Sequence, residues 1–344
     1  MTRPAALVPN ALGLTKSDYG GSPSTLCKGC GHNAVANQIV QVAFELGLDP
    51  TGIVKLSGIG CSSKSPAYFL GMSHGFNALH GRMPSIATGA LTANHGLRAL
   101  GVSGDGDTGS IGLGQFKHLL RRNLRMVYMI ENNGVYGLTK GQFSPTAEDG
   151  LTLKYAGTNP FPPVELCNEA LIGGCGFVAR AFAGDAKQLR EILKAALSHR
   201  GTAVIDVVSP CVAFNNDDDS RKSYGYGRHH EVPLQDLGYI PAREDIVVDD
   251  HEPGESRVVE LHDGSHIALR KLEAGYDPSD RGRALARLAQ AERDGEVLTG
   301  LLYFDDGRAA LAEALHLGDT PLAQLPEAKL RPDRDALERM LDRY

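Results

Sequence analysis

The stretch ALGVSGDGDTG at residues 99–109, followed by MVYMIENN at residues 126–133, decides the fold of this chain. Each stretch begins with an apolar run and ends in glycine, aspartate or asparagine. The segment between them has helical periodicity, with Phe116, Leu119 and Leu120 on one face. This order predicts a strand, a glycine-rich turn, a helix and a second strand. Open α/β sheets bind ligands at such strand ends, so we expect a ligand site here.

Two kinds of ligand are compatible with the glycine-rich turn. Residues 104–109 spell GxGxxG, and Glu131 ends the next strand, as in a Rossmann protein that binds a nicotinamide dinucleotide. However, Asp105 and Asp107 would repel a pyrophosphate unless a cation lay between them. An aspartate carboxylate, an asparagine oxygen, a backbone carbonyl, two diphosphate oxygens and a water would give Mg²⁺ the roughly six oxygen ligands it prefers. The charges therefore favour a magnesium-bound diphosphate.

The spacing of these two stretches resembles a known cofactor motif. Gly-Asp-Gly, an interval of about 25 residues and then Asn-Asn is similar to the thiamine diphosphate motif. The resemblance implies that Asp105, Asn133 and the backbone carbonyl of Val135 hold Mg²⁺ on the diphosphate. The next helix begins near Thr108 and Ser110, and its N–H groups would add donors for the phosphates.

The cysteines predict a second inorganic site. Four of the six stand where apolar runs break into loops: Cys27, Cys30, Cys61 and Cys211. We expect their thiolates to converge at one end of the sheet. Four thiolates suit either a structural zinc or a 4Fe–4S cluster, and the spacing alone does not decide between them. Cys167 and Cys175 have apolar or helical surroundings, and we expect them to pack as small hydrophobic side chains.

Five short motifs follow one another in an order that resembles a single family. They are Cys27-Lys-Gly-Cys-Gly-His32, Gly58-Ile-Gly-Cys-Ser62, His80-Gly-Arg82, Gly104-Asp-Gly106 and Tyr136-Gly-Leu-Thr-Lys-Gly-Gln142. Over roughly residues 20–215 the chain resembles the β subunit of the 2-oxoacid:ferredoxin oxidoreductases. In that family the four cysteines carry one 4Fe–4S cluster close to the thiazolium ring. The resemblance therefore favours iron and sulfide over zinc.

The same resemblance implies which residues contact thiamine diphosphate. They lie in four loops: Gly60, Cys61 and Ser62; His80; Gly104, Asp105 and Gly106; and Asn133, Tyr136, Gly137, Leu138 and Thr139. In this reading His80 approaches the diphosphate, and Arg82 contacts the substrate.

The resemblance also implies a reaction and partners. The reaction is the coenzyme A-dependent oxidative decarboxylation of a 2-oxo acid, with electrons passing through the cluster to ferredoxin, or its reverse. The carboxylate that activates the aminopyrimidine ring belongs to a second chain in this family. We therefore expect an α subunit that carries this carboxylate and the coenzyme A site, in an (αβ)₂ complex.

Two lysines bear on the choice of 2-oxo acid. Lys64 follows Cys61 closely, and Lys140 follows Asn133. Two ammonium groups at the reactive end of the cofactor would need an anion. Because 2-oxoglutarate has a second carboxylate, and family members acting on it resemble this chain at both lysines, we predict 2-oxoglutarate, giving succinyl-CoA and CO₂. Pyruvate or another 2-oxo acid is the alternative.

Composition limits the remaining choices. The chain has 344 residues, is 42% hydrophobic and 22% charged, and carries a net charge of -6. No basic arm or long apolar run is present, so we expect neither a nucleic-acid nor a membrane partner. No signal peptide is recognisable, which predicts a cytoplasmic protein without structural disulfides.

Apolar runs alternate with helical patterns over much of the chain. This alternation predicts an α/β fold with a parallel sheet covered by helices on both faces, of the diphosphate-binding type. We divide the chain into an N-terminal arm (1–25), a thiamine diphosphate, magnesium and cluster domain (26–215) and a C-terminal extension that contacts a subunit (216–344). Two other classes stay open: an NAD-binding Rossmann protein with structural zinc, and an electron-transfer scaffold with a vestigial thiamine site.

Overall fold

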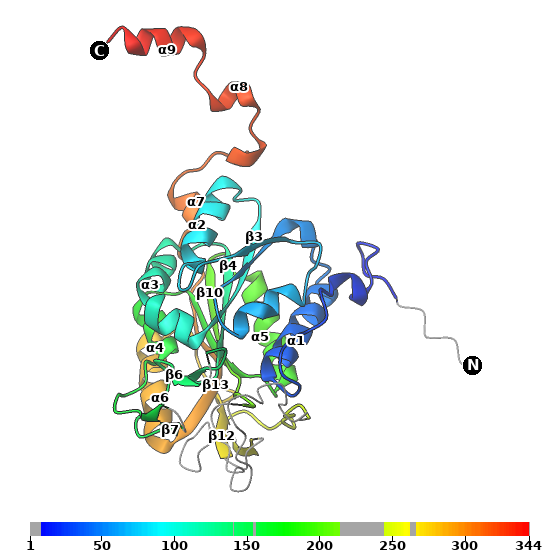
Figure 1. The fold of residues 1–344 in the computed structure, drawn as a ribbon, viewed down its shortest axis with the longest axis vertical. Coiled ribbons are helices and arrows are strands. Elements are labelled where there is room, and N and C mark those ends of the chain that lie inside the picture. The colour runs from blue at the N-terminus through cyan, green and yellow to red at the C-terminus, as the bar shows by residue number, and fades with distance from the viewer. Residues whose placement is uncertain (1–7, 140, 154–155, 214–243, 262–265, 344) are drawn as a thin grey trace, which may run out of the picture.

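The computed structural model describes residues 8–139, 141–153, 156–213, 244–261 and 266–343. Its centre is a nine-stranded sheet in the order β11-β12-β13-β9-β10-β4-β3-β1-β2 (Figure 1). The bounds of these strands are β1 Ile53–Ser57, β2 His74–Asn77, β3 Arg98–Gly104, β4 Met126–Asn132, β9 Phe177–Phe182, β10 Thr202–Val208, β11 Ser256–Glu260, β12 His266–Lys271 and β13 Glu296–Phe304. The six strands from β9 to β2 pair in parallel. Four short strands form two small hairpins: β5 Val135–Tyr136 with β6 Gln142–Phe143, and β7 Thr152–Leu153 with β8 Gly157–Thr158.

Helices cover both faces of the sheet. The longer ones are α1 Gly31–Glu45, α2 Met83–Ala93, α3 Leu113–Arg122, α4 Leu166–Ile172, α5 Ala186–Ser198, α6 Arg281–Asp294 and α9 Arg334–Leu341. Helices α2, α3, α4 and α6 share one apolar core with the sheet, and α1 and α5 share another. Short helical turns lie between them: η1 Lys16–Tyr19, η2 Pro50–Gly52, η3 Ser62–Ala67, η4 Asp107–Ile111, α7 Leu311–Ala314, η5 Leu322–Gln324 and α8 Glu327–Leu330.

Strand β4 illustrates how the sequence produces this arrangement. Val127 and Met129 point into the core with α1 and α5, whereas Tyr128 and Ile130 point into the core with α2 and α3. Successive side chains of a strand alternate between faces, so a strand covered on both sides must be apolar throughout. All seven residues of β4 are buried. The predicted fold class, a mostly parallel sheet with helices on both faces, is confirmed.

The C-terminal third differs from the expected extension. Strand β13 pairs antiparallel with β9, and β12 and β11 continue the same sheet beyond it. Residues 256–304 therefore add strands to the central sheet and do not form a separate unit. A domain boundary at residue 215 would cut through this one sheet. The reason is that β13 adds to the edge that β9 would otherwise expose. Residues 214–243, which contain the start of the expected extension, lie outside the described residues.

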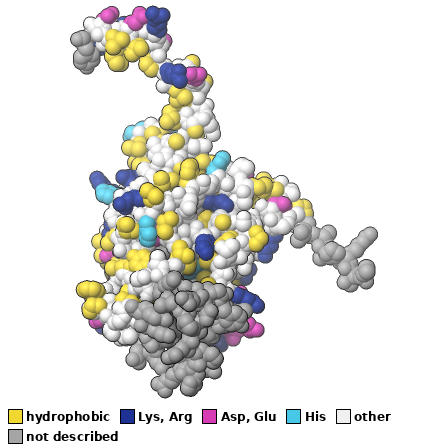
Figure 2. Space-filling model, viewed as in Figure 1, with side chains coloured by type: hydrophobic (Ala, Val, Ile, Leu, Met, Phe, Trp, Pro, Cys, Tyr) yellow, Lys and Arg dark blue, Asp and Glu magenta, His cyan; other side chains and the backbone are white. Residues whose placement is uncertain are grey.

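After α7 the chain first packs on α2, where Gly318 O lies 2.9 Å from His95 Nε2, and beyond η5 it extends away from the rest of the structure (Figure 1). We call residues 315–343 the C-terminal tail. Large apolar side chains stand exposed along it: Leu315, Leu322, Leu330, Leu337, Met340 and Leu341. Figure 2 shows hydrophobic side chains gathered on the tail.

Candidate cofactor site

The Gly-Asp-Gly and Asn-Asn motifs meet at the carboxyl ends of β3 and β4, as the sequence predicts. Gly104 lies opposite Glu131 in the parallel pair, which brings the two following loops together. The Asp105 carboxylate accepts a hydrogen bond from the backbone N–H of Gly134 at 3.1 Å and lies 3.5 Å from that of Asn133. Its side chain is almost fully buried, with the residue 2% exposed. Adjacent parallel strands thus place a carboxylate against the turn that carries Asn133 and Val135.

Two hydroxyl groups complete the surroundings of Asp105. Ser144 Oγ donates to Asp105 Oδ2 at 2.5 Å, and Thr146 Oγ1 donates to the same oxygen at 2.6 Å. Within the described ranges, no lysine, arginine or histidine nitrogen lies within 4 Å of this carboxylate. A buried carboxylate without a cation is costly. The donor set therefore fits a bound cation, because Mg²⁺ prefers carboxylate, amide and carbonyl oxygens.

The second aspartate of the motif has a different environment. Asp107 Oδ1 accepts from the N–H of Gly81 at 2.7 Å and lies 2.5 Å from His80 Nδ1. Its other oxygen accepts from Ser103 Oγ at 2.7 Å. A Cβ on Gly58 would approach Asp107 Oδ2 to 1.9 Å, so no side chain fits there. Asp107 thus holds the His80 loop against the site, whereas Asp105 has no lysine, arginine or histidine nitrogen beside it among the described residues.

The loop after Asn133 closes over the glycine-rich turn. Tyr136 Oη donates to the carbonyl of Gly106 at 3.0 Å, and the Tyr136 ring lies 6.3 Å from that of His80. A Cβ on Gly106 would come within 2.3 Å of the Tyr136 ring. Burial raises the pKa of Tyr136, and the charges of Asp105 and Asp107 raise it further. The close approach of the Tyr136 ring is therefore the reason that residue 106 must be glycine.

The remaining residues of this loop are more open. Thr139 Oγ1 donates to the carbonyl of Tyr136 at 3.3 Å, and Leu138 is 52% exposed. Lys140, predicted to bind the substrate, lies outside the described residues.

The four loop cysteines gather at the same end of the sheet. Cys30 caps the start of α1, Cys61 follows β1, and Cys211 follows β10. Burial raises the pKa of the Cys30 thiol well above its usual range, and the charges of Cys211 and Cys27 add to this rise. Burial also raises the pKa of Cys61, to which Cys27 contributes, whereas Lys64 lowers it. Each thiol therefore lies within electrostatic reach of another.

The distances between these sulfur atoms can be compared with those in a tetrahedral zinc site. Tetrahedral zinc, with Zn–S bonds of about 2.3 Å, holds its thiolates about 3.8 Å apart. Among the residues that the structure describes, no three of these sulfur atoms lie within 4.8 Å of one another. A cluster of four irons binds each thiolate at a different iron and holds them further apart. Among the described residues, then, these thiols do not form a preassembled tetrahedral zinc site.

The other two cysteines are interior, as expected. Cys167 and Cys175 are fully buried. Cys175 Sγ donates to the carbonyls of Phe177 and Thr202 at 3.2 Å, and Cys167 Sγ lies 4.0 Å from Asp206 Oδ2. Both pack in the core with α4.

A buried pair beside the cysteines was not predicted from sequence. His32 Nδ1 lies 3.5 Å from Glu131 Oε2 and 2.8 Å from Ser209 Oγ, and Ser65 Oγ donates to Glu131 at 3.0 Å. Burial lowers the pKa of His32 to about 4 and raises the pKa of Glu131 well above its usual range. Burial therefore disfavours the charged form of both groups. Glu131 is the next-to-last residue of β4, where a Rossmann protein would use it to bind ribose, but here it faces the interior.

The predicted substrate residues Lys64 and Arg82 lie in the loop after β1 and at the start of α2. Lys64 is half-buried in η3, three residues after Cys61. Arg82 is exposed, and its Nη1 donates to the carbonyl of Ile111 at 3.4 Å. Ser62 is buried, and a Cβ on Gly104 would meet its hydroxyl at 2.9 Å.

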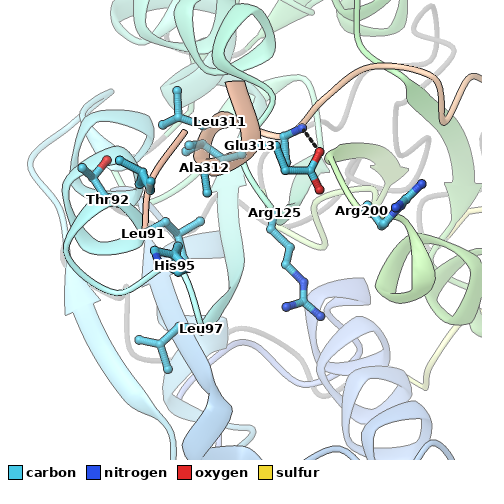
Figure 3. A pocket seen from close by; sticks show the side chains of 12 residues that line it. Leu91, Thr92, His95, Leu97, Arg125, Arg200, Leu311, Ala312 and Glu313 are labelled. Atoms are coloured by element: carbon cyan, nitrogen blue, oxygen red, sulfur yellow. Dashed lines mark hydrogen bonds between the residues drawn. The ribbon is translucent and has the colours of Figure 1, made fainter. Parts of the chain in front are cut away.

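A hollow of about 390 Å³ lies at the opposite end of the strands, where β3 and β4 begin (Figure 3). Its lining includes Leu97 and Arg125, which directly precede β3 and β4, and Leu311 of α7. The cofactor motifs follow the other ends of these strands. None of the predicted site residues lines the hollow, so it is distinct from the candidate site.

Comparison with known proteins decides the family. The family described as thiamine pyrophosphate enzyme, C-terminal TPP binding domain, matches residues 58–207. The 2-oxoglutarate synthase subunit KorB of Methanocaldococcus jannaschii is 36% identical over 196 residues, which cover 56% of this chain and 71% of that protein. The chain belongs to the β subunits of the 2-oxoacid:ferredoxin oxidoreductases. The alternative of an NAD-binding Rossmann protein with structural zinc is therefore wrong.

Other relatives place the β subunit in the same family. The 2-oxoglutarate oxidoreductase subunit KorB of Mycobacterium tuberculosis is 44% identical over 194 residues, covering 55% of this chain and 51% of that protein. The 2-oxoacid:ferredoxin oxidoreductase subunit beta of Saccharolobus solfataricus is 43% identical over 197 residues, covering 55% and 63%. The match thus spans between half and two thirds of these two relatives.

A solved structure resembles the β subunit over most of its length. It is the 2-oxoglutarate:ferredoxin oxidoreductase from Magnetococcus marinus with 2-oxoglutarate, coenzyme A and succinyl-CoA bound. The TM-score is 0.69 at 32% identity, and the alignment covers 88% of this chain and 89% of that one. In the described part of the β subunit, no helix has the length and apolar character needed to cross a bilayer.

Proposed function

We propose that this chain is the catalytic β subunit of a 2-oxoglutarate:ferredoxin oxidoreductase. It would carry out the coenzyme A-dependent oxidative decarboxylation of 2-oxoglutarate to succinyl-CoA and CO₂, with electrons passed to ferredoxin, or the reverse. The observation that carries the proposal is the buried Asp105 carboxylate, which faces the turn at Asn133 and Val135 and has no lysine, arginine or histidine nitrogen beside it in the described part of the chain. The domain that holds the cofactors spans residues 26–215 in this proposal, after an arm at 1–25.

The thiamine diphosphate site would be built as follows. Asp105, Asn133 and the carbonyl of Val135 hold Mg²⁺, and His80 stands beside the diphosphate, kept in place by Asp107. Bound thiamine diphosphate supplies an electron sink for the carbanion that decarboxylation leaves. The chain's own residues bind and orient the cofactor through the loops described above.

The four loop cysteines would hold one 4Fe–4S cluster. Cys30 is 8% exposed, and Cys27, Cys61 and Cys211 are partly exposed. Coordination to iron would keep these thiols deprotonated in spite of their burial. A single set of four loop cysteines provides ligands for one cluster, from which electrons would pass to ferredoxin.

The substrate assignment rests on charge. Lys64 is half-buried beside the cluster loop, and Lys140 would add a second ammonium group for the distal carboxylate of 2-oxoglutarate. Arg82 is proposed as a further substrate contact. The Magnetococcus marinus enzyme, whose structure contains 2-oxoglutarate, supports this choice. Pyruvate or another 2-oxo acid is the alternative, because some relatives are named as general 2-oxoacid enzymes.

The proposed site is shared with an α subunit. That subunit would supply the carboxylate for the aminopyrimidine ring and the coenzyme A site, in an (αβ)₂ complex. The C-terminal tail supports a contact with another chain, because α9 exposes Leu337, Met340 and Leu341. A helix of eight residues is too short to be stable alone in water, so it needs a surface on which to bury this stripe.

Co-purification with the α subunit tests the proposal. The complex should contain iron, acid-labile sulfide and thiamine diphosphate, and should reduce ferredoxin with 2-oxoglutarate and coenzyme A. The isolated chain, loaded with cofactor, should not decarboxylate. Zinc without thiamine in the purified complex would overturn the proposal, whereas a preference for pyruvate would overturn only the substrate.

A further inference from the structure

A second buried carboxylate lies close to the candidate cofactor site. Asp206, in the middle of β10, is fully buried and accepts a hydrogen bond from Arg180 Nε at 2.8 Å. Arg180, on β9, also pairs with Glu165, which caps α4. The ligand-type atoms of Glu165, Cys167 and Asp206 lie within 4.8 Å of one another. The guanidinium already supplies the positive charge here, so this group is an ion-pair cluster rather than a metal site.

A chain of hydrogen bonds connects this cluster to Asp105. Asn132 Nδ2 donates to Asp206 Oδ1 at 3.1 Å. On its other side, Asn132 Oδ1 lies 3.0 Å from Thr146 Oγ1, which lies 2.6 Å from Asp105 Oδ2. Every member of the chain is buried, with Asn132 at 6%, Thr146 at 3% and Asp105 at 2% exposure.

The carboxylate of Asp206 fixes the orientation of the Asn132 amide. An acceptor such as a carboxylate must face the amide NH₂ group, so the amide oxygen must face Thr146. The reversed amide would place its oxygen against Asp206, leaving two buried acceptors in contact without a proton. Arg180 therefore orients Asp206, and Asp206 orients Asn132. The single Thr146 hydroxyl proton lies between two acceptors, Asp105 Oδ2 at 2.6 Å and Asn132 Oδ1 at 3.0 Å, and the shorter contact, to the charged carboxylate, takes the larger share of it.

This arrangement treats the two oxygens of Asp105 differently. Oδ2 receives three donors: Gly134 N–H at 3.1 Å, Ser144 Oγ at 2.5 Å and Thr146 Oγ1 at 2.6 Å. Among the described residues, Oδ1 receives only the long contact with Asn133 N–H, at 3.5 Å. The occupied oxygen holds the carboxylate in one rotamer, and the other oxygen keeps its lone pairs for a cation.

We propose that Thr146 and Asn132 are positioning residues that hold Asp105 so that its Oδ1 faces the magnesium of the diphosphate. The inference rests on the proposed function, in which Asp105 binds that metal. Asn132, the first asparagine of the Asn-Asn pair, acts through its neighbours and does not touch the cofactor. The Asp206–Arg180 pair on β10 and β9 anchors the network to the interior of the sheet.

The test uses the αβ complex depleted of cofactor, with calorimetric titration of thiamine diphosphate in Mg²⁺. Thr146→Val removes the hydroxyl and keeps the shape, and its loss of a charge-assisted hydrogen bond should weaken binding about 10- to 100-fold. Thr146→Ser restores a hydroxyl and should recover most of the affinity. Asn132→Ala should weaken binding less, and adding it to Thr146→Val should cause little further loss, because both act through one hydroxyl. Iron content and melting temperature monitor the fold.

The outcomes separate this inference from the function on which it rests. Wild-type affinity in Asp105→Ala would overturn the proposed function. Loss of binding in Asp105→Ala with unchanged affinity in Thr146→Val would overturn the positioning role alone. Equal losses in Thr146→Val and Thr146→Ser, or additive losses in the double variant, would show that the loop serves only the fold.

Discussion

Two buried carboxylates flank β4, and their surroundings differ in one respect. Asp206, on β10, has the guanidinium of Arg180 at 2.8 Å. Asp105, after β3, has only neutral donors: two hydroxyls and the N–H groups of a turn. Both are equally removed from water, at 0% and 2% exposure. The comparison teaches that the interior carboxylate is paired with a charge within the chain, whereas the carboxylate at the carboxyl end of β3 has no such partner among the described residues.

The sharpest way to break this comparison is to remove Asp105. Asp105→Ala should abolish Mg²⁺-dependent binding of thiamine diphosphate, because it removes the only anionic ligand proposed, while the fold persists. Calorimetry measures the affinity, and circular dichroism checks the fold. Full affinity in this variant would show that the edge carboxylate needs no external cation.

The cysteines extend the comparison from carboxylates to thiols. Cys30→Ser and Cys211→Ser, at the edge, should each lose most of the iron, because each removes a proposed cluster ligand. Cys167→Ser, beside Asp206 in the interior, should keep it and serves as the matched control. Iron and sulfide analysis decides between them. Iron loss from Cys167→Ser, with Cys211→Ser unaffected, would reverse the assignment of the two regions.

Removing the interior carboxylate should act on stability. Asp206→Ala leaves the Arg180 guanidinium without its fully buried partner, which costs about 3–5 kcal/mol of unfolding free energy. Denaturant unfolding of the complex measures this loss. The double variant Asp206→Ala with Arg180→Met should recover part of it, because the buried guanidinium is then absent and only the partly exposed Glu165 loses its partner. If Asp206→Ala unfolds like the wild type, the two carboxylates do not differ in the way described.

A smaller effect is expected on substrate selectivity when a proposed substrate contact is removed. Lys64→Ile removes one proposed contact with the distal carboxylate of 2-oxoglutarate, worth about 1.5–3 kcal/mol, or about 10- to 150-fold in kcat/KM. Pyruvate has no distal carboxylate and should be spared. The measurement is the ratio of kcat/KM for the two acids. An equal fall for both would assign Lys64 to the cofactor, the cluster or the fold.

The smallest expected effect concerns an interior histidine. His199 is buried between the rings of Phe177 and Phe304, and burial lowers its pKa from its usual 6.5. Because the folded state disfavours the proton that the unfolded chain binds, stability should be present above about pH 6.5 and decline as the pH falls below it. His199→Phe should flatten this decline in denaturant unfolding between pH 7 and 5. An unchanged slope would exclude His199 as its source.

Much of the site was predictable because its residues stand at strand ends. Parallel strands that are neighbours bring their carboxyl ends together, so Gly-Asp-Gly and Asn-Asn had to meet. Asp185 and Asp280 likewise cap the starts of α5 and α6. Their carboxylates accept hydrogen bonds from the backbone N–H groups of Gln188 and Arg283, each at 3.0 Å. Local chemistry of this kind is visible in the chain itself.

Other features depend on contacts that no local pattern encodes. Thr146 is a single hydroxyl in an irregular loop, and Arg180 and Asp206 are lone charges within otherwise apolar strands. The Ala- and Leu-rich run from Pro84 to Gly101 predicts one helix, but α2 ends at Ala93 because Asn94-His-Gly96 interrupts it before β3. The pairing of β13 with β9 joins strands that are far apart in the sequence, and no local pattern in either strand specifies its partner.

The far edge of the sheet has a practical consequence for handling the protein. Strand β2, His74–Asn77, is the last strand of the described sheet, and all four of its residues are exposed. Phe76, within β2, and Met72, just before it, are each 50% exposed. An open strand edge with apolar side chains is a template for pairing with another chain. Expressed alone, the chain is therefore expected to associate through this edge, and co-expression with the proposed α subunit should raise its soluble yield.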